Sequence, residues 1–134
     1  MVVCLVTGLI LGVYCGKGRI HDFALFKKSR LKVHPKIAIL ADLGFLGIAK
    51  LHTKSCLPFK KSKNKPLTKP EKQANRGQAR QRVAVENRNR DCKIFRIVKD
   101  VYRGKHKNYG SNWNLVAGLV NFKSATKNLK FASP

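Results

Sequence analysis

The sequence predicts a mixed α/β fold within a single domain of 134 residues, and three observations support this prediction. Residues 1–16 carry no charged side chain and are rich in β-branched residues, which favours one or two buried strands. An apolar run at 37–41 has the length of a further buried strand. Thr68 and Glu71 have capping-box spacing, and apolar residues recur at helical spacing from Trp113, so the second half predicts helices.

The first half of the chain contains the strands and short connecting elements. Residues 16–19 form a turn, and Asp22 can cap a short helix whose apolar side chains are Phe23, Leu25, Phe26 and Leu31. Pro35 ends that element. The apolar strand that follows stops at Asp42, and residues 48–51 fit a brief helix.

The second half is more basic and mostly helical. Residues 58–70 contain many lysines and three prolines, which excludes a core element and indicates a mobile basic loop or insert. A helix is expected from Thr68 to about Arg96, followed by a second basic loop with aromatic residues at 101–110. The last helix follows Ser111. Its apolar stripe is predicted to hold Trp113, in the core, with Leu115, Val116, Leu119, Val120 and Phe122.

The net charge is the most unusual property of the sequence. Lys and Arg number 29 and Asp and Glu number 6, which gives +23. Such a charge opposes a compact state unless an anionic partner neutralises it. Nucleic acid is the first candidate and an anionic membrane surface is the second.

No membrane or export signal is predicted at the N-terminus. The uncharged run of 16 residues is shorter than the roughly 20 that a bilayer requires. It also lacks the basic residues that open a secretory signal. We therefore expect no membrane partner and a cytoplasmic protein, associated with the nucleoid if it is bacterial. The four cysteines have neither zinc-site nor disulfide-framework spacing, so we expect free, buried thiols.

Only six carboxylates are available for acid-dependent chemistry. Asp42 ends a predicted buried strand, which is where ligands bind in α/β folds. Taken alone, Asp42 is better explained as the cap of the next short helix. Glu86 lies in an apolar stretch of a basic helix. Taken alone, it is better explained as an ion pair with Arg82 or Arg90, each four residues away.

Together these residues belong to an ordered set of motifs. They are His21-Asp22-Phe23, Ala41-Asp42-x-Gly44-Phe45-x-Gly47 and the segment from Asn75 through Arg82-Val83-x-Val85-Glu86-Asn87. On these motifs, the chain resembles insertion-sequence transposases of the DDE superfamily, in their DDE endonuclease domain. The resemblance covers residues 16–31, 39–52, 60–87 and 93–122.

The resemblance implies a ribonuclease-H-like mixed sheet flanked by helices and cut-and-paste DNA chemistry. In this family two Asp and one Glu hold two divalent cations, Mg²⁺ or Mn²⁺, which stabilise charge on the attacking and leaving oxygens of a phosphodiester. By resemblance, Asp42 is the second Asp and Glu86 is the Glu, so both are expected to be catalytic and metal-binding. Oligomers in a transposition complex are also expected.

One part of the family pattern is missing. The first Asp of the family lies on a strand upstream of the His21-Asp22-Phe23 motif, and residues 1–15 hold no carboxylate. Asp22 belongs to that motif and is not an obvious replacement. We therefore expect residues 1–134 to be one partial catalytic domain, incomplete at its N-terminus, and inactive alone.

The positive charge suggests a path for DNA. The candidate DNA-binding residues are Lys60, Lys61, Lys63, Lys65, Arg80, Arg82, Arg88 and Arg90. The plain alternative is a solvated charged surface. Two other function classes stay open: a non-enzymatic basic nucleic-acid-binding protein, which composition alone favours, and a cationic protein of the membrane surface.

Overall fold

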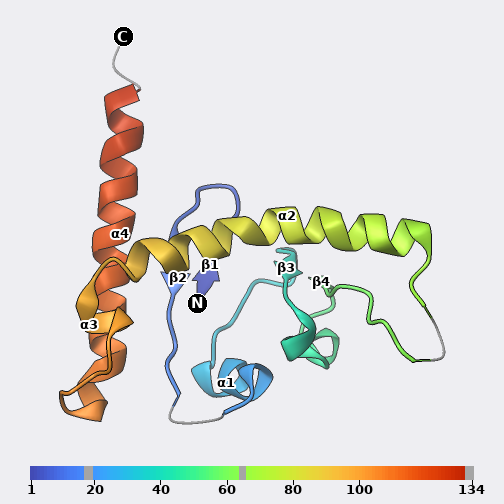
Figure 1. Cartoon of the computed structure of the whole chain (residues 1–134), viewed down its shortest axis with the longest axis horizontal. Coiled ribbons are helices and arrows are strands. Elements are labelled where there is room, and N and C mark those ends of the chain that lie inside the picture. The colour runs from blue at the N-terminus through green and yellow to red at the C-terminus, as the bar shows by residue number, and fades with distance from the viewer. Residues whose placement is uncertain (17–19, 64–65, 132–134) are drawn as a thin grey trace. The chain divides into compact units, whose positions relative to one another are not determined.

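A computed structural model describes residues 1–16, 20–63 and 66–131 as helices, short strands and loops. This confirms a mixed α/β composition. The chain forms two compact units (Figure 1). The first, here called the core unit, joins residues 1–15 to 83–134, and the second, the Asp42 unit, comprises residues 16–82.

The core unit begins with a β-hairpin. Strand β1 (Val2–Val3) pairs antiparallel with β2 (Ile10–Gly12), and Val3 lies opposite Ile10. The two strands lie side by side in Figure 1. Gly8, in the turn between them, has a φ of 69°, which a residue without a side chain adopts at no steric cost. The apolar, β-branched N-terminus therefore forms strands, as predicted. The strands are less buried than predicted, because Ile10 is buried but Leu11 is 64 % exposed.

The rest of the core unit is helical. It contains the last part of α2 (Lys69–Cys92), the short helix α3 (Arg96–Lys99), a 3₁₀ turn at His106–Asn108 and α4 (Tyr109–Phe131). The hydrophobic core lies between these elements and the hairpin. Its buried members are Ile10, Cys92, Val98, Trp113, Val116, Ala117 and Val120. The placement of Trp113 in the core is confirmed, with 9 % of its surface exposed.

Helix α4 is joined to β2 by one side chain as well as by apolar packing. Asn121 Nδ2 donates to the carbonyl oxygen of Ile10 at 2.9 Å, and its Oδ1 accepts from the Ile10 N–H at 2.8 Å. The amide thus satisfies both backbone groups of a strand residue, as a neighbouring strand would.

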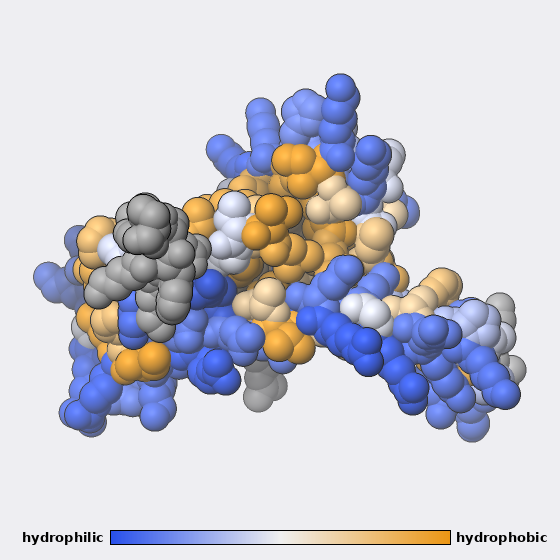
Figure 2. Space-filling view, turned by 90° about the horizontal axis from the view of Figure 1, so that it is seen from above, coloured by the Kyte–Doolittle hydropathy of each residue, from blue (hydrophilic) through white to orange (hydrophobic). Residues whose placement is uncertain are grey.

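Half of the apolar stripe of α4 is not covered. Leu115, Leu119 and Phe122, which belong to the predicted apolar stripe, are exposed by 65 %, 46 % and 70 %. Figure 2 shows such hydrophobic surface between the hydrophilic side chains on the face it draws. Among the residues that the structure describes, no helix is sufficiently long and apolar to cross a bilayer.

The Asp42 unit begins with α1 (Asp22–Ser29). His21, not Asp22, is the N-cap, because its Nδ1 accepts from the Phe23 N–H at 3.4 Å. Asp22 is instead the first helical residue, where a carboxylate is favoured by the helix dipole. The helix ends at Ser29, before Pro35, because Arg30 adopts a left-handed conformation with φ 52°. The predicted turn at 16–19 lies largely outside the described residues.

The predicted buried strand at 37–41 is shorter than expected. Only Ile39–Leu40 forms β3, which pairs parallel with β4 (Ser55–Cys56). Ile37 is 57 % exposed, whereas Ala41 is buried. Two short strands cannot cover both ends of the apolar run, so only its end near Asp42 is enclosed. Within the described residues the strands make two separate two-stranded sheets.

Helix α2 starts at the predicted capping box. The Thr68 N–H and hydroxyl donate to Glu71 Oε2 at 2.7 and 2.9 Å, and the Glu71 N–H donates back to Thr68 Oγ1 at 3.4 Å. One turn further, Asn75 bonds both backbone groups of Phe59, at 2.8 and 3.0 Å. This pair of bonds ties the start of the basic loop to the helix. The described residues between Pro58 and Thr68 form no helix, as predicted, but α2 begins at Lys69, inside the predicted range of the loop.

Candidate metal and nucleic-acid site

Asp42 lies at the end of β3 and is the cap of the 3₁₀ turn at Leu43–Phe45. Its Oδ1 accepts from the Gly44 N–H at 2.9 Å. Its Oδ2 faces Arg82 Nη2 at 3.4 Å, and each of the two side chains is 37 % exposed. The capping explanation of Asp42 is therefore correct. It leaves room for a ligand role, since the carboxylate is still open to solvent.

A second carboxylate lies against the same glycine. A Cβ built on Gly44 would be 3.0 Å from Asp42 Oδ1 and 3.0 Å from Asp22 Oδ2. Because both oxygens are equally near one point, they are at most twice that distance apart. Local sequence patterns do not predict that the two carboxylates lie close together, because Asp22 and Asp42 are 20 positions apart in the chain. The sequence feature that links them is that each lies in one of the motifs on which the family resemblance rests.

Two further features, a glycine with positive φ and an aromatic contact, fix the backbone around Asp42. Gly47 has a φ of 99°, and a Cβ there would be 3.2 Å from the Phe23 ring. Phe45 packs edge-on against Phe26, with ring centroids 6.1 Å apart. Both contacts connect the loop after Asp42 to α1, the helix that begins with Asp22. Ile48 is completely buried beneath this turn.

Glu86 is exposed on α2 and belongs to the core unit, whereas Asp42 belongs to the other. Within the described ranges, Glu86 makes no ion pair with Arg82 or Arg90; Arg82 pairs with Asp42 instead. A shared site of Asp42 and Glu86 stays a prediction.

The donors at Asp42 suit the cation that the DDE pattern calls for. Mg²⁺ prefers carboxylate oxygens, usually from one or two carboxylates, and keeps several of its waters. Asp42 offers a half-exposed carboxylate that a backbone N–H holds in place. The described part of the chain contains no group of three His, Cys, Asp or Glu residues arranged around one ion position. The residues therefore fit a hydrated hard cation and not a closed structural metal site.

The candidate DNA-binding residues fall into two groups. Five side chains are exposed: Lys60, Lys61, Lys63, Arg80 and Arg90. Lys65 lies outside the described residues. Arg82 forms an ion pair with Asp42. Arg88 is bonded to other residues of the core unit.

The Arg88 side chain donates three hydrogen bonds within the core unit. Its Nε donates to the Gly8 carbonyl at 2.7 Å, and its Nη1 donates to Ser124 Oγ at 2.8 Å and to Asp91 at 3.2 Å. One guanidinium thus joins the hairpin turn, α2 and α4. Sequence reasoning missed this role, because nothing in the local pattern around Arg88 points to a partner 80 residues away.

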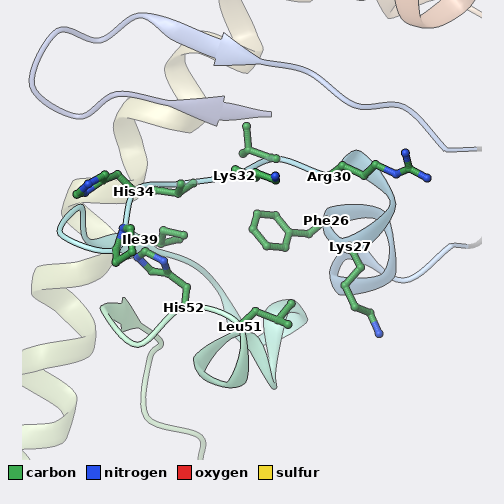
Figure 3. Close-up of a pocket in the computed structure, with 11 residues that line it drawn as sticks. Phe26, Lys27, Arg30, Lys32, His34, Ile39, Leu51 and His52 are labelled. Atoms are coloured by element: carbon green, nitrogen blue, oxygen red, sulfur yellow. The ribbon is translucent and has the colours of Figure 1, made fainter.

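A cavity of about 750 Å³ lies elsewhere in the Asp42 unit (Figure 3). Phe26 points into it from α1, and Ile39, Leu51 and His52 lie across from Phe26. Basic side chains, Lys27, Arg30, Lys32 and His34, also line it, and no acidic residue does. His52 is buried, and its Nε2 bonds the Ile37 carbonyl at 2.7 Å, so that nitrogen is used by the fold.

Comparison with known proteins identifies the family. Residues 1–121 match the DDE superfamily endonucleases. The chain belongs to this family. The resemblance to insertion-sequence transposases is thereby confirmed, and the match includes the N-terminal hairpin.

A curated relative agrees with the family assignment. The chain is 45 % identical, over 121 residues, to the probable transposase for insertion sequence element IS702 of Microchaete diplosiphon. The aligned region is 90 % of this chain and 44 % of that protein. The chain thus spans less than half the length of the curated relative it matches. No solved structure matches the chain.

Proposed function

We propose that this chain contributes the second Asp and the Glu of a DDE transposase centre, Asp42 and Glu86, and that it binds the DNA substrate. The observation that carries the proposal is the half-exposed carboxylate of Asp42, which lies in a family motif at the end of a strand. The ribonuclease-H-like arrangement is part of the same proposal, since it comes with the family.

Asp42 and Glu86 would hold Mg²⁺ or Mn²⁺, which would supply positive charge to stabilise the attacking and leaving oxygens of a phosphodiester. The chain's own residues orient the ligands. The Gly44 N–H fixes one oxygen of Asp42, which reduces its freedom to rotate. Glu86 follows Arg82 by four residues on α2, so the two side chains share a face of that helix.

DNA is the proposed partner. The exposed lysines of the basic loop and the exposed arginines of α2 neutralise phosphates, and a transposition complex brings further copies of the protein to the DNA. The proposed place of action is therefore the cytoplasm, at the nucleoid of a bacterial cell. The 134 residues hold no carboxylate ahead of Asp22, so we propose that they bind DNA without cleaving it on their own.

Salt-dependent DNA binding and plasmid nicking together test this proposal. The triple variant Lys60→Gln, Lys61→Gln, Lys63→Gln is expected to lower the slope of log affinity against log salt by about 0.9 for each phosphate that these lysines neutralise. A control with the same change of charge replaces exposed Lys93, Lys99 and Lys105. An equal decrease of the slope in both triple variants would contradict a defined DNA path.

The nicking assay tests the activity of the chain by itself. Supercoiled plasmid is incubated with the chain and Mg²⁺ or Mn²⁺, and it is expected to stay intact. Nicking by the unmodified chain that disappears in Asp42→Ala would show that Asp42 is catalytic and would overturn the proposed inactivity. Nicking that persists in Asp42→Ala would point to a contaminating nuclease and would leave the expected result in place.

A further inference from the structure

We infer that Asp22 is a ligand of the same divalent cation as Asp42, and that Arg82 takes the place of this cation when none is bound. The inference rests on the proposed function only in taking Asp42 as a metal ligand. It adds a carboxylate that the DDE pattern does not assign to the site. The juxtaposition of Asp22, Gly44 and Asp42 within the Asp42 unit carries it.

The first step is the approach of the two carboxylates. Asp22 Oδ2 and Asp42 Oδ1 both lie 3.0 Å from the position of a Gly44 Cβ. Any larger residue at position 44 would therefore press on both oxygens at once. Gly44 has no positive φ that would require glycine for backbone reasons. A glycine at this position thus avoids a close contact with both carboxylates.

The second step is the charge. Two carboxylates at this separation repel each other unless a cation lies near them. Arg82 supplies a positive charge on one side, with its Nη2 3.4 Å from Asp42 Oδ2. This distance is long for a bidentate or tightly bonded pair. An arginine held so loosely can be displaced by a divalent cation, and can then turn to a phosphate of the DNA.

The third step is the position of Asp22. A first-turn carboxylate is favoured at the start of any helix, and this explains why an acidic residue is tolerated there. It does not explain why Asp22 faces Asp42. The contacts of Phe23 with Gly47 and of Phe26 with Phe45 hold α1 against the loop that follows Asp42. The fold therefore maintains the approach of the two carboxylates.

Binding of Mn²⁺, measured from the signal of the free ion by electron paramagnetic resonance, tests the inference without any nuclease assay. Asp22→Asn, which removes a proposed ligand, is expected to weaken Mn²⁺ binding at least about tenfold, because loss of even a group that only supports a ligand costs about 10–100-fold. Gly44→Ala, which fills the space without changing charge, is expected to weaken it as well. Arg82→Gln is expected to strengthen binding more than Arg80→Gln, which removes the same charge from an exposed residue of the same helix.

The variants separate failure of this inference from failure of the proposed function. If Asp42→Asn abolishes Mn²⁺ binding and Asp22→Asn leaves it unchanged, Asp22 is not a ligand and the inference is overturned, while the function stands. If Asp42→Asn has no effect, the metal role of Asp42 fails and the inference fails with it. Glu86→Gln tests the third predicted ligand independently. Circular dichroism of the Asp22→Asn variant should match the unmodified chain, since Asp22 is exposed.

Discussion

Each of the two units is stabilised by a different kind of internal contact. The core unit encloses a continuous set of seven buried residues from the hairpin, α2, α3 and α4. Among the described residues of the Asp42 unit, 16, 20–63 and 66–82, only Ala41, Ile48 and His52 are buried, and the last of these is polar. Its backbone is fixed by caps, a glycine with positive φ and edge-on aromatic contacts. Stability is concentrated in one unit, and the candidate site lies on the irregular backbone of the other, as is common for functional residues.

The two units nevertheless use one device in common. Asn121 in the core unit and Asn75 in the Asp42 unit each bond both backbone groups of one residue, Ile10 and Phe59 respectively. The first pair of bonds is half-buried and the second is exposed. The same chemistry should therefore contribute more stability in the core unit.

The largest expected effect comes from disrupting the apolar core. Trp113→Ala should lower the free energy of unfolding by about 3–5 kcal/mol, because it leaves a large cavity beside Val116 and Val120. Denaturant unfolding followed by circular dichroism measures this decrease. Leu115→Ala on the same helix is the control, since Leu115 is 65 % exposed. Equal decreases in the two variants would contradict the described core.

The paired asparagines give the next effect. Asn121→Leu should cost about 1–3 kcal/mol, because it leaves a half-buried N–H and a carbonyl of β2 without partners. Asn75→Leu should cost less, since water can replace the exposed bonds to Phe59. Thermal unfolding of the two variants measures the difference. A larger destabilisation by Asn75→Leu would reverse the comparison between the units.

The capping box predicts a smaller effect. Thr68→Ala should destabilise the chain by about 1 kcal/mol, because it removes the hydroxyl that bonds both to Glu71 Oε2 and to the Glu71 N–H. The change in helicity near the start of α2 can be followed from backbone chemical shifts. Unchanged shifts at residues 69–72 would show that the box does not hold the helix start.

The smallest expected effect is a difference in reactivity between two cysteine thiols, Cys4 and Cys92. A hydrogen bond with the Thr7 side chain lowers the pKa of the Cys4 thiol, whereas burial raises the pKa of the Cys92 thiol. At pH 7, Cys4 should therefore react with iodoacetamide well before Cys92. Raising the pH should reduce the difference between their alkylation rates. Mass spectrometry of partly alkylated chain gives the order. Early modification of Cys92 would show that the core opens readily.

Local patterns predicted those features that depend on neighbours in sequence. The capping box at Thr68 and the apolar N-terminal strands were predicted from spacing and residue type, and both are confirmed. Of the two explanations of Asp42, the cap is seen in the structure. The family match covers position 42, and the role of Asp42 in the DDE triad stays a prediction.

Features that depend on distant partners were missed. Periodicity marks Leu115 and Phe122 as apolar positions of α4, yet it cannot say whether anything covers them, and both are exposed. The inward role of Arg88 and the approach of Asp22 to Asp42 depend on contacts across 80 and 20 residues of chain. Expecting all four thiols to be buried was also wrong: Cys92 is buried and Cys56 is exposed.

The most direct test of the account asks where Mn²⁺ binds. In a ¹H–¹⁵N spectrum of the chain, a small amount of Mn²⁺ should first broaden the Gly44 amide, which bonds Asp42 Oδ1, and its neighbours. Asp42→Asn should abolish that selective broadening, whereas Asp100→Asn, at an exposed ion pair with Arg96, should leave it unchanged. Broadening that begins elsewhere, or that persists in Asp42→Asn, would contradict a cation site at Asp42.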